Sequence, residues 1–267
     1  MTEIEINKKM VTQFKKTSIH YSITGKGKCV VLLHGFLLNT KIWSGLIPLL
    51  SKKNKVLAID LPGHGKSDCI DEIHSMELLA DLVNFILEEN NITIANLLGH
   101  SMGGYVSLAF LEKYSSKINT IVLLNSTTEE DSLMRKKNRD RMLKIIHANK
   151  NVIVREAIRS LFPEKKLEVY KDLIELLTEN ALKLSKQAIM ASIHGMKLRS
   201  DRTQILKLFN GKKYIISGIE DPIIPFSDSR KIAIDSDTEL IRVNSGHMSV
   251  NENHREIIEV MKQIGFI

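Results

Sequence analysis

The chain is poor in features that define whole classes of protein. It has two cysteines, Cys29 and Cys69, without a Cys-x-x-Cys pair, so we expect free thiols and no cysteine-based metal site. No apolar run approaches the roughly 20 residues that cross a bilayer, and residues 1–9 lack the apolar core of a signal peptide. Aromatic residues make up 5% of the chain, and no aromatic and basic platform for nucleic acid is evident. We therefore expect a cytoplasmic protein that binds neither membranes nor nucleic acids.

Apolar residues, in contrast, are numerous enough for a packed core. They form 43% of the 267 residues, and this length suits one α/β core with an insertion. Positive charge is concentrated in residues 126–205, which hold 17 lysines and arginines against 11 aspartates and glutamates. This excess indicates either a lysine-rich solvated surface or electrostatic attraction of an acidic partner.

Short apolar runs alternate with helical patterns through the first half of the chain. Three runs have the length and composition of buried strands: 29–33, 55–59 and the run that precedes Ser101. Two segments between them have helical periodicity: 41–50 and 76–89. This alternation is typical of a doubly wound parallel sheet, in which ligands bind beyond the carboxyl ends of the strands.

The most informative stretch is residues 99–103, Gly-His-Ser-Met-Gly, with Ser101 at its centre. It joins an apolar run to a helical pattern over residues 102–114. At a sharp turn from strand to helix the turning residue is strained, and the flanking glycines prevent side chains from colliding. The serine hydroxyl would then be exposed beside the unpaired amides of the helix N-terminus, which suits a developing oxyanion.

Two further motifs accompany this stretch. His34-Gly35-Phe36 follows the first apolar run, and a loop rich in proline and glycine, residues 60–67, follows the second. Together with residues 99–104, these motifs have the order and spacing of the α/β-hydrolase family. The chain resembles this family over about residues 17–125 and 205–265.

The resemblance implies an α/β-hydrolase fold, a mostly parallel, doubly wound sheet with a helical cap inserted after the sixth strand. Residues 126–205 contain several helical patterns and no strand-like run. We therefore expect a core domain of residues 1–125 and 206–267, and a helical cap of residues 126–205.

The resemblance also implies a catalytic triad. With Ser101 as nucleophile, the family order of acid and then histidine assigns the acid to Asp221 and the base to His247. His247 would take the serine proton, and Asp221 would orient the imidazole. Glu220 is the alternative acid, but the spacing favours Asp221. Asn125, which follows the preceding strand, cannot carry a charge.

The oxyanion hole and the substrate pocket follow from the same resemblance. The backbone N–H groups of Phe36 and Met102 are the expected oxyanion donors. The residues expected to line the pocket are His34, Gly35, Leu37, His100 and Met248. Alternatively, His34 is a structural residue that bonds the local backbone. The other histidines, His64 among them, have no role in this prediction.

A serine nucleophile excludes the branches of the family that use aspartate, and carbon–carbon hydrolases usually have a different oxyanion loop. We predict a serine hydrolase that cleaves a carboxylic ester or related acyl bond through an acyl-enzyme on Ser101, without a cofactor or metal. Its partner would be a small-molecule ester or an acidic acyl carrier protein. The alternatives are a lactonase, a cofactor-free haloperoxidase-like enzyme, or a sensor that binds a small ligand and acts through a protein partner.

Overall fold

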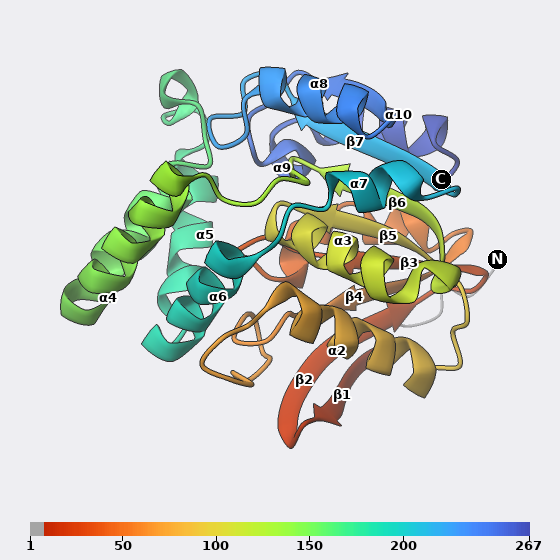
Figure 1. Ribbon diagram of the computed structural model, residues 1–267, viewed down its shortest axis with the longest axis horizontal. Helices are drawn as coiled ribbons and strands as arrows, with labels where there is room; N and C mark the ends of the chain where they lie inside the picture. The colour runs from red at the N-terminus through yellow and green to blue at the C-terminus, as the bar shows by residue number, and fades with distance from the viewer. Residues whose placement is uncertain (1–7) are drawn as a thin grey trace.

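The computed structural model describes residues 8–267. Most of residues 1–9, which we expect to lack a signal peptide, therefore lies outside the described residues. Eight strands form one sheet: β1 (Lys8–Phe14), β2 (Thr17–Thr24), β3 (Lys28–Leu33), β4 (Asn54–Ile59), β5 (Ala95–His100), β6 (Ile118–Leu124), β7 (Lys212–Gly218) and β8 (Glu239–Val243). Their order is β1-β2-β4-β3-β5-β6-β7-β8 (Figure 1). Strand β2 pairs antiparallel with β1 and β4, whereas all other neighbours are parallel.

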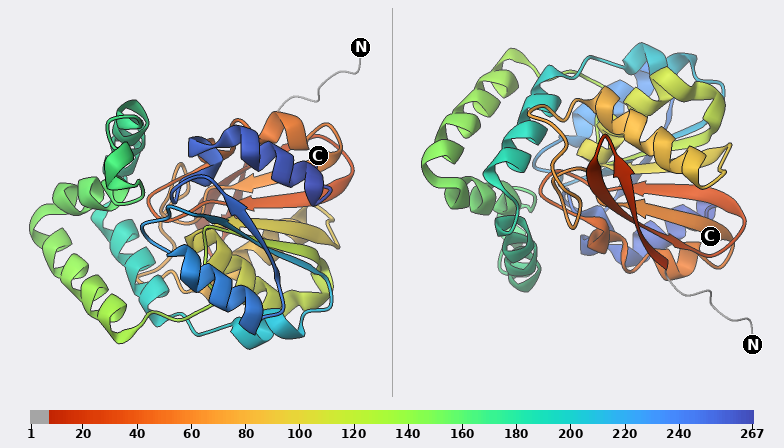
Figure 2. Two further views of the ribbon diagram at one scale, coloured as in Figure 1. Left: turned by 90° about the horizontal axis from the view of Figure 1, so that it is seen from above. Right: turned by 90° about the horizontal axis from the view of Figure 1, so that it is seen from below.

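Helices cover both faces of this sheet (Figure 2). One face carries α1 (Ile47–Leu50) and α10 (His254–Gln263), and the other carries α2 (Met76–Glu89), α3 (Met102–Tyr114) and α8 (Phe226–Asp235). Every residue of β5 is buried, as is every residue of β3 after Lys28. Because each buried aliphatic side chain stabilises the fold by about 1.5–3 kcal/mol, these strands hold the loops at their carboxyl ends firmly.

Helices also fill the chain between β6 and β7. They are α4 (Leu133–Arg159), η3 (Glu164–Lys166), α5 (Lys171–Leu182), α6 (Lys186–Leu198) and α7 (Thr203–Leu208). Helices α4, α5 and α6 stack beside the sheet, away from the helices that cover its faces (Figure 1). Residues 132–150 and 152–161 have two separate helical patterns in the sequence, and within α4 the backbone leaves helical geometry at Asn149, with φ −150° and ψ 91°.

The fold class predicted from the sequence is confirmed, including the helices inserted after the sixth strand. The expected helix over residues 41–50 is wrong: it is divided into the short η1 (Thr40–Trp43) and α1, which begins near Pro48. Proline suits a helix start and disrupts a helix interior. The boundary between the helical cap and the core domain at residues 205/206 stays a prediction. It falls inside α7, which packs against α3.

The remaining short helices are η2 (Ser115–Lys117) and α9 (Ser249–Glu252). Among residues 8–267, none of the helices combines the length and the apolar character that a membrane span requires. The cytoplasmic location stays a prediction.

Candidate active site

The loops after β5, β7 and β8 bring Ser101, Asp221 and His247 together. His247 Nε2 lies 2.9 Å from Ser101 Oγ. On the other side of the ring, Nδ1 lies 2.8 Å from Asp221 Oδ2 and 3.0 Å from Oδ1. Three residues that are distant in the sequence therefore form one hydrogen-bonded chain.

Ser101 occupies a strained turn between β5 and α3. Its φ of 51° and ψ of −117° are unusual for a residue with a side chain. A Cβ atom on Gly99 would lie 2.4 Å from the carbonyl oxygen of Gly103, and one on Gly103 would lie 2.2 Å from that of Leu33. The two flanking glycines are thus required by close backbone contacts. The Ser101 side chain does not cap α3, so its hydroxyl is available to His247.

Asp221 is buried and held by several donors. Its Oδ1 accepts the backbone N–H groups of Ile223 and Ile224 at 2.8 and 2.9 Å, and its Oδ2 accepts Asn125 Nδ2 at 2.9 Å. Burial raises the pKa of Asp221, but His247 and these hydrogen bonds outweigh it and hold the pKa below its ordinary value. The ionised carboxylate accepts His247 Nδ1–H, which leaves Nε2 free to accept the Ser101 hydroxyl proton.

The histidine loop is braced by a residue with no signal in the sequence. Glu252, the last residue of α9, accepts the N–H of Gly246 on Oε2 at 2.8 Å and that of Met248 on Oε1 at 2.9 Å. Its carboxylate therefore accepts hydrogen bonds from the backbone on both sides of His247. Glu220, the alternative acid, instead pairs with two lysines of the inserted helices, Lys165 and Lys166.

The turn after β3 is tied to the loop after β4 by His34. Its Nδ1 donates to the carbonyl of Gly35 at 2.8 Å, and its Nε2 accepts the N–H of Leu61 at 2.9 Å. These contacts agree with the alternative prediction for His34, a structural residue that bonds the local backbone. Burial lowers the pKa of His34, which keeps the ring neutral, as its acceptor role at Nε2 requires.

His64 makes a second connection between these two loops. Its Nε2 accepts the N–H of Leu37 at 3.1 Å, and its Nδ1 donates to the carbonyl of Pro62 at 3.0 Å. Leu37 has a φ of 62°, so this hydrogen bond secures a strained turn. Burial lowers the pKa of His64 to about 3, and nothing in the sequence pattern distinguishes this histidine from the others.

Two backbone amides near Ser101 are free to bind an anion. Within residues 8–267, neither the N–H of Phe36 nor that of Met102 donates a hydrogen bond to another protein group. Met102 directly follows Ser101 at the start of α3, and Phe36 lies in the turn that His34 and His64 hold.

A cavity of about 330 Å³ lies over Ser101 and His247. Both the loops of the sheet and the inserted helices line it: Gly35, Phe36, Leu37, Leu38, His100, Ser101, Tyr105, Arg139, Met142, Ile153, Glu156, Ala157, Ile158, Ser160, Leu161, Met196, Ile223 and His247. His34 and Met248 are not among these residues, so their predicted place in the pocket stays a prediction.

His100 supports the site from within the wall of this cavity. Its Nε2 donates to the backbone carbonyl of His247 at 2.9 Å, whereas its Nδ1 has no partner in the described part of the chain. Burial, with a smaller effect of the neighbouring His247, lowers the pKa of His100 to about 3. The ring is therefore a neutral donor that helps to place His247.

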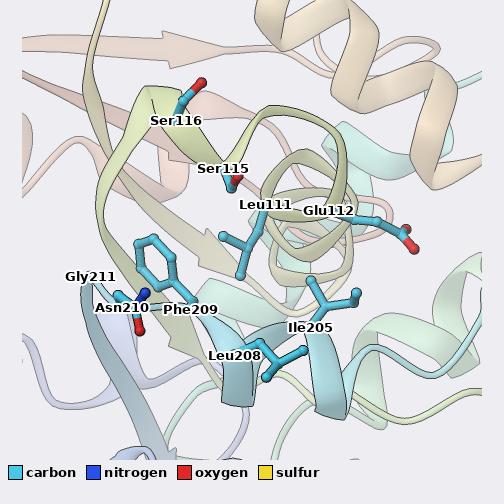
Figure 3. A pocket seen from close by; sticks show the side chains of 9 residues that line it. All are labelled: Leu111, Glu112, Ser115, Ser116, Ile205, Leu208, Phe209, Asn210 and Gly211. Carbon is cyan, nitrogen blue, oxygen red and sulfur yellow. The ribbon is translucent and has the colours of Figure 1, made fainter.

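A second cavity, of about 390 Å³, lies between α3 and residues 205–211 (Figure 3). It contains one ionisable lining residue, Glu112, whose carboxylate accepts Arg202 Nε at 2.9 Å. Ser115 and Ser116 also line it, but among the described residues neither hydroxyl is hydrogen-bonded to Glu112. Across residues 8–267, no cluster of three or more histidine, cysteine, aspartate or glutamate side chains is arranged to hold a metal ion.

Residues 28–253 match the model of the alpha/beta hydrolase fold family. A pimeloyl-[acyl-carrier protein] methyl ester esterase of Aeromonas hydrophila is 34% identical over 39% of this chain and 39% of its own length. A 2-hydroxy-6-oxononadienedioate/2-hydroxy-6-oxononatrienedioate hydrolase of Escherichia coli is 34% identical over 45% of this chain and 43% of its own length. Each match thus spans less than two thirds of the relative.

The fold is also similar to that of a solved esterase. The structure of a thermophilic esterase from Thermogutta terrifontis has 25% sequence identity and a TM-score of 0.88, and the match covers 97% of both chains.

Proposed function

The chain belongs to the α/β hydrolase fold family, and we propose that it is a serine hydrolase that cleaves a carboxylic ester through an acyl-enzyme on Ser101. The observation that carries this proposal is the hydrogen-bonded chain from Ser101 Oγ through both ring nitrogens of His247 to the buried Asp221. A serine hydroxyl is a poor nucleophile until a neighbouring base takes its proton, and this chain supplies such a base.

In the acylation step, Ser101 Oγ attacks the ester carbonyl while His247 Nε2 accepts the hydroxyl proton. Asp221 stabilises the resulting imidazolium. The carbonyl oxygen becomes an oxyanion, for which the N–H groups of Phe36 and Met102 are the proposed donors. Each donor of this kind lowers the barrier by about 3–4 kcal/mol. The intermediate then expels the alcohol, which takes the proton from His247.

In the deacylation step, His247 removes a proton from water, and the hydroxide attacks the acyl carbonyl. The second tetrahedral intermediate collapses, Ser101 Oγ leaves with the proton from His247, and the carboxylic acid is released. A cavity of about 330 Å³ with many apolar lining residues supports a short or medium acyl group.

An ester carried by an acidic acyl carrier protein is a second candidate substrate. Two observations favour it: the relative from Aeromonas hydrophila is named as an esterase of such a carrier-bound ester, and residues 126–205 hold most of the net positive charge. Attraction between exposed charges is screened by salt. Added salt should therefore slow the reaction of a carrier-bound ester and leave that of a small neutral ester unchanged.

The proposed function is tested with p-nitrophenyl esters from acetate to decanoate, on the intact chain and on Ser101→Ala. We expect turnover by the intact chain, an optimum at short or medium chain length, and a loss of at least about a thousandfold in Ser101→Ala. Equal activity of the two proteins would contradict the mechanism. If neither turns over any ester, the lactonase, haloperoxidase-like and sensor alternatives come forward.

A further inference from the structure

Two arginines share one buried carboxylate beside the cavity over Ser101. Asp131 precedes α4, Arg139 lies on α4 and Arg199 follows α6. The side chain of Asp131 is 0% exposed, that of Arg199 is 2% exposed and that of Arg139 is 16% exposed. Arg199 Nη1 lies 2.7 Å from Asp131 Oδ1, and Arg139 contacts the same carboxylate through Nε and Nη2.

This cluster carries an uncompensated positive charge. Burial raises the pKa of Asp131, but hydrogen bonds and charges from Arg139 and Arg199 outweigh it and hold the pKa below its ordinary value. Asp131 is therefore ionised, and one negative charge faces two guanidinium groups that stay protonated. A buried or partly buried charge without a partner is costly, so a second anion would be bound favourably here.

The two arginines differ in what they can offer to a ligand. Arg199 Nη1 also donates to the carbonyl of Met196, Nε donates to the carbonyl of Glu129, and the guanidinium lies 4.2 Å from the ring centre of Tyr105. Its buried Nη2 has no hydrogen-bond partner among the described residues, but Arg199 does not line the cavity. Arg139 lines the same cavity as Ser101 and His247. Within residues 8–267, its Nη1 makes no hydrogen bond, so this end of the guanidinium can donate to a ligand.

Glu156 is the other charged residue of the lining, and it makes no ion pair with Arg139. Its side chain is exposed, and the described residues contain no ion pair within 4.0 Å between Glu156 and Arg139. Most of the other lining side chains from the inserted helices are apolar: Met142, Ile153, Ala157, Ile158, Leu161 and Met196. The cavity thus combines an apolar wall with one available guanidinium.

We propose that the cavity takes an ester with a carboxylate at its remote end, and that Arg139 binds this carboxylate while Ser101 attacks the ester carbonyl. The inference that the ligand is an ester rests on the proposed function, whereas the inference that Arg139 binds an anion does not. A guanidinium suits this role because its planar array of N–H donors matches a carboxylate, and such charge-assisted hydrogen bonds are stronger than neutral ones.

The test compares matched esters that differ in the remote charge. Monomethyl succinate, glutarate and adipate are each compared with the methyl ester of the monocarboxylic acid of the same chain length, and the released acid is titrated. We expect the intact chain to favour the best charged ester by at least about tenfold in kcat/KM. Arg139→Gln should bring this ratio to about one, and Arg139→Lys should give an intermediate ratio because lysine keeps the charge but loses the planar array.

Arg141→Gln is the matched control. Arg141 lies on the same helix, is exposed and does not line the cavity, so its removal changes the charge of α4 without touching the subsite. The ratio should persist in this variant. The proposal is overturned if Arg139→Gln keeps the preference, or if Arg141→Gln loses it to the same extent, because charge at a distance would then explain it.

Binding to Ser101→Ala separates the subsite from the chemistry. Calorimetric titration with monomethyl glutarate and with methyl pentanoate should show tighter binding of the charged ester, and Arg139→Lys and Arg139→Gln on this background should weaken it. This result without turnover of any ester would sustain the subsite and reject the esterase. Turnover of esters with equal binding of the two compounds would reject the subsite alone.

Discussion

The sheet and the inserted helices supply two very different walls to the cavity over Ser101. On the sheet side, the polar groups are buried and hydrogen-bonded to neighbouring side chains. Asn125 donates to the carboxylate of Asp221, and His100 donates to the backbone carbonyl of His247. On the other side, α4 and α6 contribute mainly apolar side chains, with Arg139 among them. Under the proposed function, the sheet side would fix the reacting atoms, and the helices would set the size and charge of the substrate.

The largest expected effect comes from the sheet side, at Asp221. Asp221→Asn replaces a carboxylate with an amide that cannot orient and stabilise the imidazolium of His247 in the same way, and kcat should fall by about four orders of magnitude. Steady-state kinetics on the best p-nitrophenyl ester measures the loss. Glu220→Gln is the control, because it removes the adjacent carboxylate that pairs with lysines, and kcat should stay within a few-fold. Equal losses in both variants would contradict the assignment of the acid.

The next effect is on stability and comes from the buried histidines of the sheet side. Burial depresses the pKa of His64 to about 3, whereas an unfolded histidine titrates near 6.5. The unfolded state therefore binds the proton first, and stability that is present above about pH 6.5 is lost as the pH falls toward 3. The contribution is about 1.4 kcal/mol per pH unit, or about tenfold in the unfolding equilibrium.

His64→Gln isolates this contribution, because glutamine can accept the Leu37 N–H but does not titrate. Urea unfolding at pH 7, 6 and 5 should give a free energy of unfolding that falls less steeply with acid than that of the intact chain. The difference in slope should be small between pH 7 and 6 and should approach about 1.4 kcal/mol per pH unit between pH 6 and 5, below the unfolded pKa. Parallel dependences in the two proteins would show that His64 is not kept neutral by burial.

A smaller effect is expected at Glu252, which supports the loop of His247. Glu252→Gln leaves one of the two amides, of Gly246 or Met248, without an acceptor, and we expect kcat to fall about tenfold with little change in KM. Glu259→Gln on α10 removes an exposed carboxylate and should not change kcat. An unchanged kcat in Glu252→Gln would mean that the loop does not need this support.

The smallest effect is expected on the helical side, where the substrate range should change more than the chemistry. Ala157 lines the cavity, and Ala157→Leu fills part of it. The kcat/KM for long p-nitrophenyl esters should fall several-fold relative to that for the acetate. Ala148→Leu makes the same change at an exposed position of α4, so its chain-length profile should match that of the intact chain. A matching profile in Ala157→Leu would exclude a role of α4 in selectivity.

The same comparison separates what the sequence predicts from what it does not. The strands of the sheet follow apolar runs, and Ser101 lies in a local glycine pattern, so the fold and this residue can be predicted from the sequence. Asp221 and His247 are predicted through the resemblance to the family. Asp131, Arg139 and Arg199 meet only through the packing of α4 and α6, and each is one charge among many in residues 126–205. No local pattern identifies such a cluster.

The sequence also gives no signal for the side chains that hydrogen-bond to the site residues and their loops. The sequence marks Asn125 only as a residue that cannot be the acid, yet its amide donates to Asp221. Glu252 and His64 act on backbone groups of other loops, so their roles depend on tertiary contacts. A residue type and its spacing predict chemistry at a turn, but they do not predict which distant side chain holds that turn in place.

A fluorophosphonate tests whether His247 activates Ser101 as a nucleophile, and this test needs no knowledge of the substrate. The intact chain, Ser101→Ala and His247→Gln are incubated with the reagent, and the adduct is located by peptide mass spectrometry. We expect one adduct per chain, on the peptide that contains Ser101, absent from Ser101→Ala and formed far more slowly in His247→Gln. No adduct on the intact chain, or an adduct that persists in Ser101→Ala, would contradict it.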